Sequence, residues 1–198
     1  MVLKNVRDKV EKGWTWTKKI LAAMSVWGLI FSLVTIGKLG VAFDYDDTLV
    51  FSAPAFAKAS AQAAQRYSAG FWSVVNQSYD LERPKLLAYG LAWVFRVFGF
   101  RVSVLTSRPP VDAEALKKEW RHLVPRGRFI FAGEGTKAGY LQDGNCVLFF
   151  GDGDSDIAEA KRAKVLAVRI RRGARSFFAR EDYNPGSLGE YVLPLSEY

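Results

Sequence analysis

The sequence contains very little cysteine or histidine, with one residue of each among 198. A single cysteine excludes an internal disulfide, and because Cys146 lies in an apolar run we expect it in the core rather than as a reactive thiol. His122 follows a helical pattern, and we expect it on the surface rather than as a ligand. Internal repeats and low-complexity tracts are also absent, and a chain of this length can form one catalytic domain with a small appendage.

Acidic residues are scarce relative to basic ones, because 20 Asp and Glu stand against 28 Lys and Arg and give a net charge of +8. Such a charge is typical of proteins with an anionic partner, which can be nucleic acid, a membrane surface or phosphorylated small molecules. We expect small phosphorylated substrates and no specific nucleic-acid partner. The cations gather at the N-terminus and in RIRRGARSFFAR, residues 169–180. For this second run, a solvent-exposed strand end and loop is favoured over a binding patch.

Residues 20–36, ILAAMSVWGLIFSLVTI, contain no charge, and lysines flank them on both sides. The stretch is at the lower limit of ~17 to 25 residues for a spanning helix and exceeds the ~7 to 15 of a signal-peptide core. An uncleaved membrane anchor, a cleaved signal peptide and a helix packed on protein all stay open, with cleavage ranked last. We therefore divide the chain into a basic and apolar N-terminal segment, residues 1–38, and a domain, residues 39–198.

Short apolar runs alternate with helical patterns after residue 40. Beyond the run that begins at Val41, the strand-like runs are RVSVLT, RFIFA, CVLFF and VLAVRI, residues 101–106, 128–132, 146–150 and 165–170. Helical patterns cover residues 55–66, 111–120 and 156–163, and a further helix is expected to carry Pro84 in its first turn. Strands that alternate with helices predict an α/β fold with a parallel sheet.

The stretch VAFDYDDTLV, residues 41–50, places three acids at the end of the first predicted strand. In an open parallel sheet the ligand site lies at the carboxyl ends of the strands, so Asp44 and Asp46 are expected to meet Asp152, which follows CVLFF. Buried carboxylates need cations or hydrogen-bond donors. Hard oxygen ligands of this kind suit Mg²⁺ together with a phosphate group.

Four motifs in this order resemble those of the haloacid dehalogenase superfamily: DYDDT at 44–48, an apolar strand that ends in Thr106, the downstream Lys137, and GDGDSD at 151–156. The stretches FDYDDTLVFSAPAF, TKAGYLQD, FFGDGDSDI and LGEYVLPLSEY are similar to the bacterial class B, nonspecific secreted acid phosphatases. The resemblance implies a Rossmann-like, three-layer fold with a parallel central sheet and a small helical cap segment. It also implies a Mg²⁺-dependent phosphomonoesterase that acts on nucleotides and small phosphate esters, with possible transfer of phosphate to alcohols.

The same resemblance implies a role for each matched residue. Asp44 would be the nucleophile, and Asp46 would protonate the leaving oxygen and then activate water. The implied metal ligands are Asp44, Asp46 through its carbonyl, Asp152 and Asp156. The implied phosphate- and substrate-binding residues are Thr106, Ser107, Arg108, Lys137, Phe56, Trp72 and Tyr183. Asp47 and Asp154 are expected to support the site rather than take part in catalysis.

The sequence departs from the family at Ser107, which stands where the family usually has glycine, and in the apolar helix before the first strand. We expect a membrane-anchored protein with a periplasmic or extracellular domain that can form homo-oligomers. Two alternatives stay open: a non-catalytic envelope or storage-type protein that retains the fold, and a cytoplasmic nucleotidase. The intact pair of Asp44 and Asp46 argues against the first alternative.

Overall fold

The computed structural model describes residues 2–63, 65–125, 128–133, 135–178 and 182–198, and within the N-terminal helix the side chains of 2–13, 15 and 33 are also not described. The chain divides into two compact units, Met1–Lys38 and Leu39–Tyr198. The predicted cations Lys4, Arg7, Lys9 and Lys12, as side chains, and Arg180 therefore lie outside the described residues.

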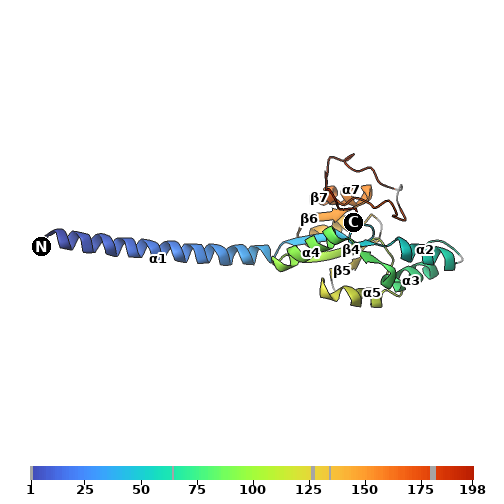
Figure 1. The fold of residues 1–198 in the computed structure, drawn as a ribbon, viewed down its shortest axis with the longest axis horizontal. Coiled ribbons are helices and arrows are strands. Elements are labelled where there is room, and N and C mark those ends of the chain that lie inside the picture. The colour runs from blue at the N-terminus through green and yellow to red at the C-terminus, as the bar shows by residue number, and fades with distance from the viewer. Residues whose placement is uncertain (1, 64, 126–127, 134, 179–181) are drawn as a thin grey trace. The chain divides into compact units, whose positions relative to one another are not determined.

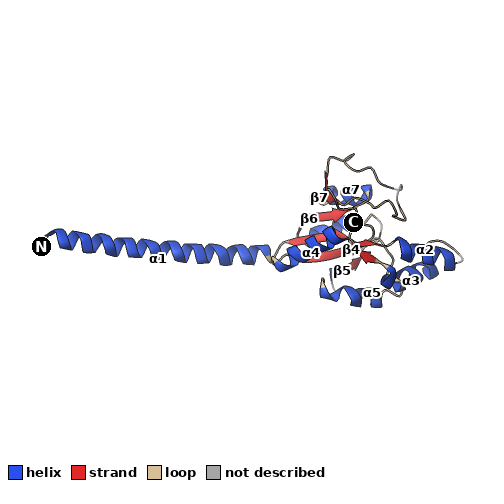
Figure 2. Cartoon of the chain, viewed as in Figure 1, coloured by secondary structure: helices blue, strands red, loops and turns tan. Residues whose placement is uncertain are grey.

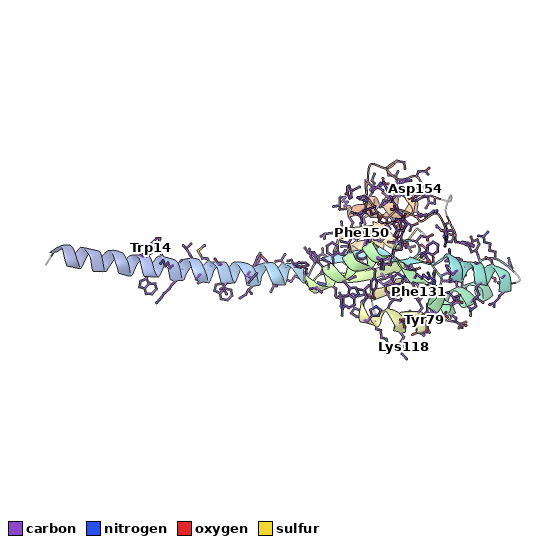
Figure 3. The ribbon with its side chains drawn as sticks, in the orientation of Figure 1. Trp14, Tyr79, Lys118, Phe131, Phe150 and Asp154 are labelled. Atoms are coloured by element: carbon purple, nitrogen blue, oxygen red, sulfur yellow. The ribbon has the colours of Figure 1, made fainter. Side chains whose placement is uncertain are left out.

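The first unit is a single helix, α1, which runs from Val2 to Ile36 (Figure 1). The apolar part of this helix extends beyond the charge-free residues 20–36. Trp16–Ile36 form a stretch of 21 residues with a mean hydropathy of 1.9, and its apolar part is not buried in the structure. At 1.5 Å per residue this stretch is about 32 Å long, which by length and composition is enough to cross a bilayer. Trp16, its first residue, and the nearby Trp14 are exposed, and Figure 3 shows Trp14 projecting from the helix.

The second unit contains a six-stranded sheet whose strands are all parallel, in the order β5-β4-β1-β6-β7-β8 (Figure 2). The strands are β1 (Gly40–Asp44), β4 (Arg101–Thr106), β5 (Phe129–Phe131), β6 (Cys146–Gly151), β7 (Leu166–Arg169) and β8 (Tyr191–Val192). The predicted strand-like runs are all confirmed. The short edge strand β8 was not predicted, because two residues give no readable pattern.

Helices cover both faces of this sheet, as the alternation of side chains along β1 requires. Phe43 points to the face that α4 (Leu86–Val97) and α5 (Glu114–Glu119) cover, where it stacks on Phe150 with ring centroids 4.5 Å apart. Ala42 points to the face that α6 (Lys137–Asp143) and α7 (Asp154–Arg162) cover. The three-layer α/β fold with a parallel sheet is therefore confirmed.

A small cap segment follows β1 and lies beyond the carboxyl end of the sheet (Figure 1). It contains α2 (Ala53–Gln62), α3 (Ala69–Gln77) and the short 3₁₀ helix η1 (Tyr79–Leu81), and an antiparallel pair of strands, β2 (Val50–Phe51) and β3 (Arg83–Pro84), closes it. Phe56, Phe71 and Val75 form its own apolar core. The prediction that Pro84 opens a helix is wrong, because Pro84 pairs with Val50 and the helix begins at Leu86. In a two-stranded ribbon, the missing N–H of a proline can face away from its partner.

The order of the strands positions the site. β1 lies in the centre of the sheet, and the chain continues to β4 on one side and later to β6 on the other. The connections from these strands therefore run in opposite directions at the carboxyl end of β1, and open α/β sheets bind ligands at such a point.

Candidate active site

The centre of the site is an ion pair between the first strand and the start of a helix. Asp44 is the last residue of β1, and Lys137 is the first residue of α6; both are buried. The Lys137 Nζ atom lies 2.5 Å from Asp44 Oδ1 and 2.6 Å from Asp156 Oδ1. One ammonium group therefore joins acids from β1 and α7.

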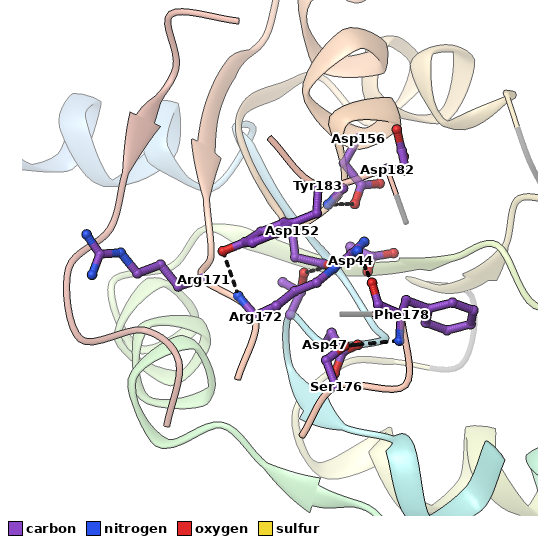
Figure 4. Close-up of polar contacts among 12 residues, drawn as sticks. Asp44, Asp47, Asp152, Asp156, Arg171, Arg172, Ser176, Phe178, Asp182 and Tyr183 are labelled. Carbon is purple, nitrogen blue, oxygen red and sulfur yellow. Dashed lines mark hydrogen bonds and ion pairs between the residues drawn. The ribbon is translucent and has the colours of Figure 1, made fainter. Parts of the chain in front are cut away.

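Three of the predicted metal ligands lie together. The carboxylates of Asp44, Asp152 and Asp156 have oxygen atoms that all lie within 4.8 Å of one another, and all three residues are buried (Figure 4). The Thr48 hydroxyl donates to Asp152 Oδ1 at 2.8 Å. Gly151 makes the cluster possible, because a Cβ at this position would lie 2.5 Å from Asp156 Cβ.

This group of carboxylates fits a divalent cation. Burial raises the pKa of Asp44 well above its ordinary value, against the attraction of Lys137, and the neighbouring acids raise it further. Burial also raises the pKa of Asp152, against the attraction of Arg172. Among the described residues, the three acids outnumber the two cations that pair with their carboxylates, Lys137 and Arg172, and hard oxygen donors of this kind are those that Mg²⁺ prefers.

The fourth predicted ligand, Asp46, turns its side chain to a different partner. Arg108 binds it through two nitrogens, with Nη2 2.5 Å from Asp46 Oδ1 and Nε 2.9 Å from Asp46 Oδ2. The Asp46 side chain is 18% exposed, whereas that of Arg108 is 1% exposed. Asp46 can therefore reach the cavity while the buried guanidinium fixes its orientation. A contact between a metal and the Asp46 carbonyl stays a prediction.

Sequence reasoning missed a second acid on the same arginine. Glu82 Oε1 lies 2.5 Å from Arg108 Nη2, and its Oε2 accepts the Tyr45 hydroxyl. The Trp120 Nε1 atom donates to that hydroxyl at 3.1 Å. Glu82 lies in the cap segment between η1 and β3, 36 residues from Asp46 in the sequence, so no local pattern indicates that it reaches the site. Its buried network holds Arg108 against Asp46.

Within its described part, the basic run of residues 169–180, which begins at the end of β7, is only partly exposed to solvent. Arg171 and Arg175 are exposed as predicted, but Arg169 is fully buried and the Arg172 side chain is 8% exposed. Arg172 forms an ion pair with Asp152 (Figure 4), and Arg169 Nη1 donates to the Asp152 carbonyl at 2.7 Å. The prediction of a solvent-exposed strand end is wrong for these two arginines, because the buried acids attract them.

Asp44, Asp46 and Lys137 line an open cavity of about 710 Å³. The other predicted site residues that line it are Phe56, Trp72, Ser107, Arg108, Asp152 and Asp156. Thr106 is buried behind it and accepts the Arg108 main-chain N–H at 3.2 Å. Tyr183 is not among the lining residues; its ring lies against Arg169 and Arg172, and its hydroxyl accepts the N–H of Arg172.

The aromatic wall of the cavity differs from the predicted one. Trp72 meets Phe56 edge to face with ring centroids 5.9 Å apart, and Tyr67 and Phe178 complete the wall. Phe178 packs on Phe56 at 5.0 Å. The sequence reasoning missed Tyr67 and Phe178 because both lie in irregular segments without periodicity. The only sequence signal that Tyr67 and Phe178 share is the presence of other aromatic residues near them.

The two remaining acids near the motifs support the site rather than line it. Asp47 is buried and accepts the Ser176 hydroxyl (Figure 4), and its backbone has φ 54°. Asp154 stands in the first turn of α7, where it accepts the N–H of Asn184 at 3.0 Å. Neither lines the main cavity. An acid in the first turn of a helix is favoured by the helix dipole.

No family model matches the chain, but the curated proteins that resemble its sequence share one name. The class B acid phosphatase of Klebsiella pneumoniae (strain 342) is 32% identical over 186 residues, which cover 84% of this chain and 76% of that protein. The class B acid phosphatase of Marinomonas sp. (strain MWYL1) is also 32% identical, over 80% of this chain and 72% of that protein. That of Salmonella typhi is 31% identical.

Solved structures resemble the fold at low sequence identity. A predicted phosphatase from Clostridium acetobutylicum aligns with a TM-score of 0.53 and 12% identity, over 80% of this chain and 95% of that one. A predicted phosphoglycolate phosphatase from Haemophilus somnus 129pt aligns with a TM-score of 0.52 and 14% identity, over 81% and 95%. At such identities the likeness concerns the fold alone.

Replacing Glu82 with Gln should change how stability depends on pH. Burial raises the pKa of Glu82 from 4.5 to about 7, although Arg108 opposes the shift. Between these two values the folded protein holds a proton that the unfolded chain releases, so wild-type stability should fall as pH rises through the window. The difference between the two pKa values corresponds to at most ~3 kcal/mol in the free energy of unfolding. Gln lacks this titration, so the variant should gain up to that amount relative to wild type by pH 7.5.

Urea unfolding of the full chain in mild detergent, from pH 4.5 to 8, would measure this difference. Glu114→Gln is the matched control, because the Glu114 side chain is 84% exposed. Its stability curve should run parallel to that of wild type. A parallel curve for Glu82→Gln as well would show that burial does not perturb Glu82.

Proposed function

Because the chain belongs to the class B acid phosphatases and is therefore a phosphomonoesterase, we propose that it hydrolyses small phosphate monoesters through a phosphoryl group held on Asp44, with Mg²⁺ as cofactor. The observation that carries this proposal is the contact of Lys137 Nζ with both Asp44 and Asp156. It places a cation beside a carboxylate that would otherwise repel an anionic phosphate.

In the first step, an Asp44 oxygen attacks phosphorus, the ester P–O bond breaks and Asp46 gives its proton to the leaving oxygen. In the second step, Asp46 takes a proton from water, the water oxygen attacks phosphorus, and the bond to Asp44 breaks to release phosphate. The covalent route divides one difficult displacement into two easier ones. The bidentate contact of Arg108 holds the Asp46 side chain in one orientation at the edge of the cavity.

Asp44, Asp152, Asp156 and the Asp46 carbonyl would hold the metal ion. When bound, Mg²⁺ would neutralise part of the negative charge on the phosphoryl group. The main supporting observation is the excess of buried carboxylate over local cation in this cluster. Lys137 on one side and Arg108 on the other would bind the remaining phosphoryl oxygens, together with Thr106 and the hydroxyl of Ser107.

The shape and lining of the cavity favour a broad range of organic groups on the phosphate. Its aromatic wall of Phe56, Tyr67, Trp72 and Phe178 offers flat surfaces that can stack a nucleoside or an aryl group. Stacking is tolerant of the exact ring, and the cavity is large enough for a nucleotide-sized ligand. An alcohol that binds at this wall could replace water in the second step, which would give phosphotransfer.

We further propose that Trp16–Ile36 anchor the chain in a membrane, with residues 39–198 in the periplasm or outside the cell. The stretch is long enough, and two of its polar side chains find hydrogen-bond partners within the helix: Ser25 Oγ donates to the Leu21 carbonyl and Ser32 Oγ to the Gly28 carbonyl, each at 2.9 Å. Such bonds are needed where no water is present. The cations before the span favour a cytoplasmic N-terminus.

Removal of metal should abolish activity. We expect excess chelator to stop the hydrolysis of nitrophenyl phosphate and added Mg²⁺ to restore it. Asp152→Asn removes one carboxylate of the cluster and should raise the half-saturating Mg²⁺ concentration at least about tenfold. Asp154→Asn, two residues later, is the matched control, because Asp154 pairs with Arg169 and Asn184 instead. Undiminished turnover in chelator would overturn the metal assignment but not the phosphatase activity.

Asp44 and Asp46 should differ in how their loss depends on the leaving group. Asp44→Asn removes the nucleophile and should abolish turnover of every substrate. Asp46→Asn removes only the proton donor, so a nitrophenolate should still leave in a rapid burst and turnover should then stall, because water activation also needs Asp46. Alkyl phosphates need a protonated leaving oxygen and should lose about 10² to 10⁴-fold in rate.

Rapid mixing with the two substrate types would measure the burst. Asp47→Asn is the control for removing an acid from the same loop, because burial raises the pKa of Asp47 to about 7 and the neutral amide resembles its protonated form. It should leave both steps close to wild type. Equal losses of Asp46→Asn on both substrates, without a burst, would remove Asp46 from its proposed role.

Alkaline carbonate washing tests the anchor. Full-length chain should stay in the membrane pellet, because a spanning helix is not held by charge. Val26→Arg combined with Leu29→Arg places two cations within the span, each costing ~2.5 to 3.5 kcal/mol, and should move the chain into the supernatant. Release of the wild-type chain would favour a helix that packs on protein, as in a cytoplasmic nucleotidase.

A further inference from the structure

The end of the sheet opposite the active site exposes large apolar side chains. Because the strands are parallel, the segments that lead into them lie at one end, and the register pairs Gly40 with both Arg101 and Cys146. At this end Val97 is 78% exposed, Phe98 64%, Val147 42% and Leu166 66%. These four residues come from three separate segments, so the exposed apolar surface belongs to the folded domain rather than to one loop.

Cations accompany these apolar side chains at the same end. Arg96 and Lys164 are exposed, and Arg101 and Arg128 are half-buried. Four of the lead-in segments, residues 37–40, 96–101, 144–147 and 163–166, contain no acid. The neighbouring Asp143 lines a small cavity of about 200 Å³ with Arg101 and Arg128.

The chain ties this end to the apolar helix. Ile36 is the last residue of α1 and Gly40 the first of β1, so only Gly37, Lys38 and Leu39 lie between them. Four residue steps of chain reach at most about 14 Å. If Trp16–Ile36 span a bilayer, the amino end of β1 cannot move further than this from the point where the helix leaves the lipid.

We propose that the amino-end surface, formed by Arg96–Arg101, Arg128, Val147 and Lys164–Leu166, rests on a bilayer that contains anionic lipids. This inference rests on the proposed membrane anchor. The apolar side chains lie at the boundary of headgroups and acyl chains, and the cations contact lipid phosphates. The mixture fits this partner better than a second copy, because two surfaces rich in cations would repel each other.

The consequence is a fixed orientation of the enzyme. The active site lies at the carboxyl ends of the strands, so a domain that rests on its amino end presents the cavity to the aqueous phase. Substrates then reach the site without passing between the domain and the membrane. A tethered domain without such a surface would instead tumble on its linker.

Helix α4 offers a matched pair of positions for a test. It runs antiparallel to the strands, so its first residue, Leu86, lies at the carboxyl end and its last residue, Val97, at the amino end. Both are 78% exposed. In a Cys146→Ser background, a nitroxide label is attached to Val97→Cys or to Leu86→Cys of the full chain. The labelled chain is reconstituted in vesicles of phosphatidylcholine with or without phosphatidylglycerol.

In vesicles with phosphatidylglycerol, the Val97 label should collide with lipid-soluble oxygen and be protected from an aqueous nickel complex, whereas the Leu86 label should be open to nickel. The ratio of oxygen to nickel collisions at Val97 should fall at least about fivefold when Arg96 and Lys164 are both changed to Glu. Lys58→Glu with Arg83→Glu is the control, because both cations are exposed and belong to the cap segment. It should leave the ratio unchanged.

The outcomes are distinguishable. If the chain stays in the carbonate pellet but both labels are equally open to nickel, the docking surface is wrong and the anchor stands. If carbonate releases the chain, both proposals are wrong, while phosphatase activity in the same preparation tests the proposed reaction separately. Spin–spin broadening of the Val97 label, which depends on protein concentration, would show that the surface is an interface between copies and would overturn lipid docking.

Discussion

The burial of three carboxylates within a few ångströms is the constraint on which the rest of this structure depends. Ionised acids repel each other in a low-dielectric site, so Asp44, Asp152 and Asp156 can be buried together only beside cations. Lys137 begins α6 at the one place from which its ammonium reaches two of them, and Arg172 folds back to the third. The segment after β7 therefore covers the site instead of extending into solvent.

Asp44 and Asp46 lie two residues apart but in different electrostatic surroundings. Asp44 is buried, with Lys137 as its cation and two other acids close by. Asp46 is partly exposed and is bound by Arg108, which Glu82 and Tyr45 hold from behind. Two carboxylates whose environments differ in this way are suited to different tasks. The division between an attacking acid and a proton-transferring acid, which the sequence motifs imply by resemblance, stays a prediction.

The sheet and the centre of the site could be predicted because both depend on local patterns. Apolar runs indicated the strands, and the acids that follow Phe43 directly and Phe150 after one glycine had to meet at one edge of a parallel sheet. The burial of Glu82 and Arg172, in irregular segments, and of Arg169, at the end of β7, could not be predicted. A charged residue in such a place is usually exposed, and only the tertiary fold shows which one finds a buried partner. For the same reason Phe178, rather than Tyr183, lines the cavity: both follow β7 in segments without a period.

The parallel sheet also keeps the chemistry of its two ends apart. Asp44 lies four residues beyond Gly40 along β1, a rise of about 13 Å. This exceeds the screening length of about 8 Å at physiological ionic strength, so solvent-exposed charges near Arg101 act only weakly on the carboxylates. Cations and apolar side chains can therefore accumulate at the amino end without perturbing the proton affinity of Asp44. A fold of this kind allows one end to contact an anionic surface while the other end binds an anionic substrate.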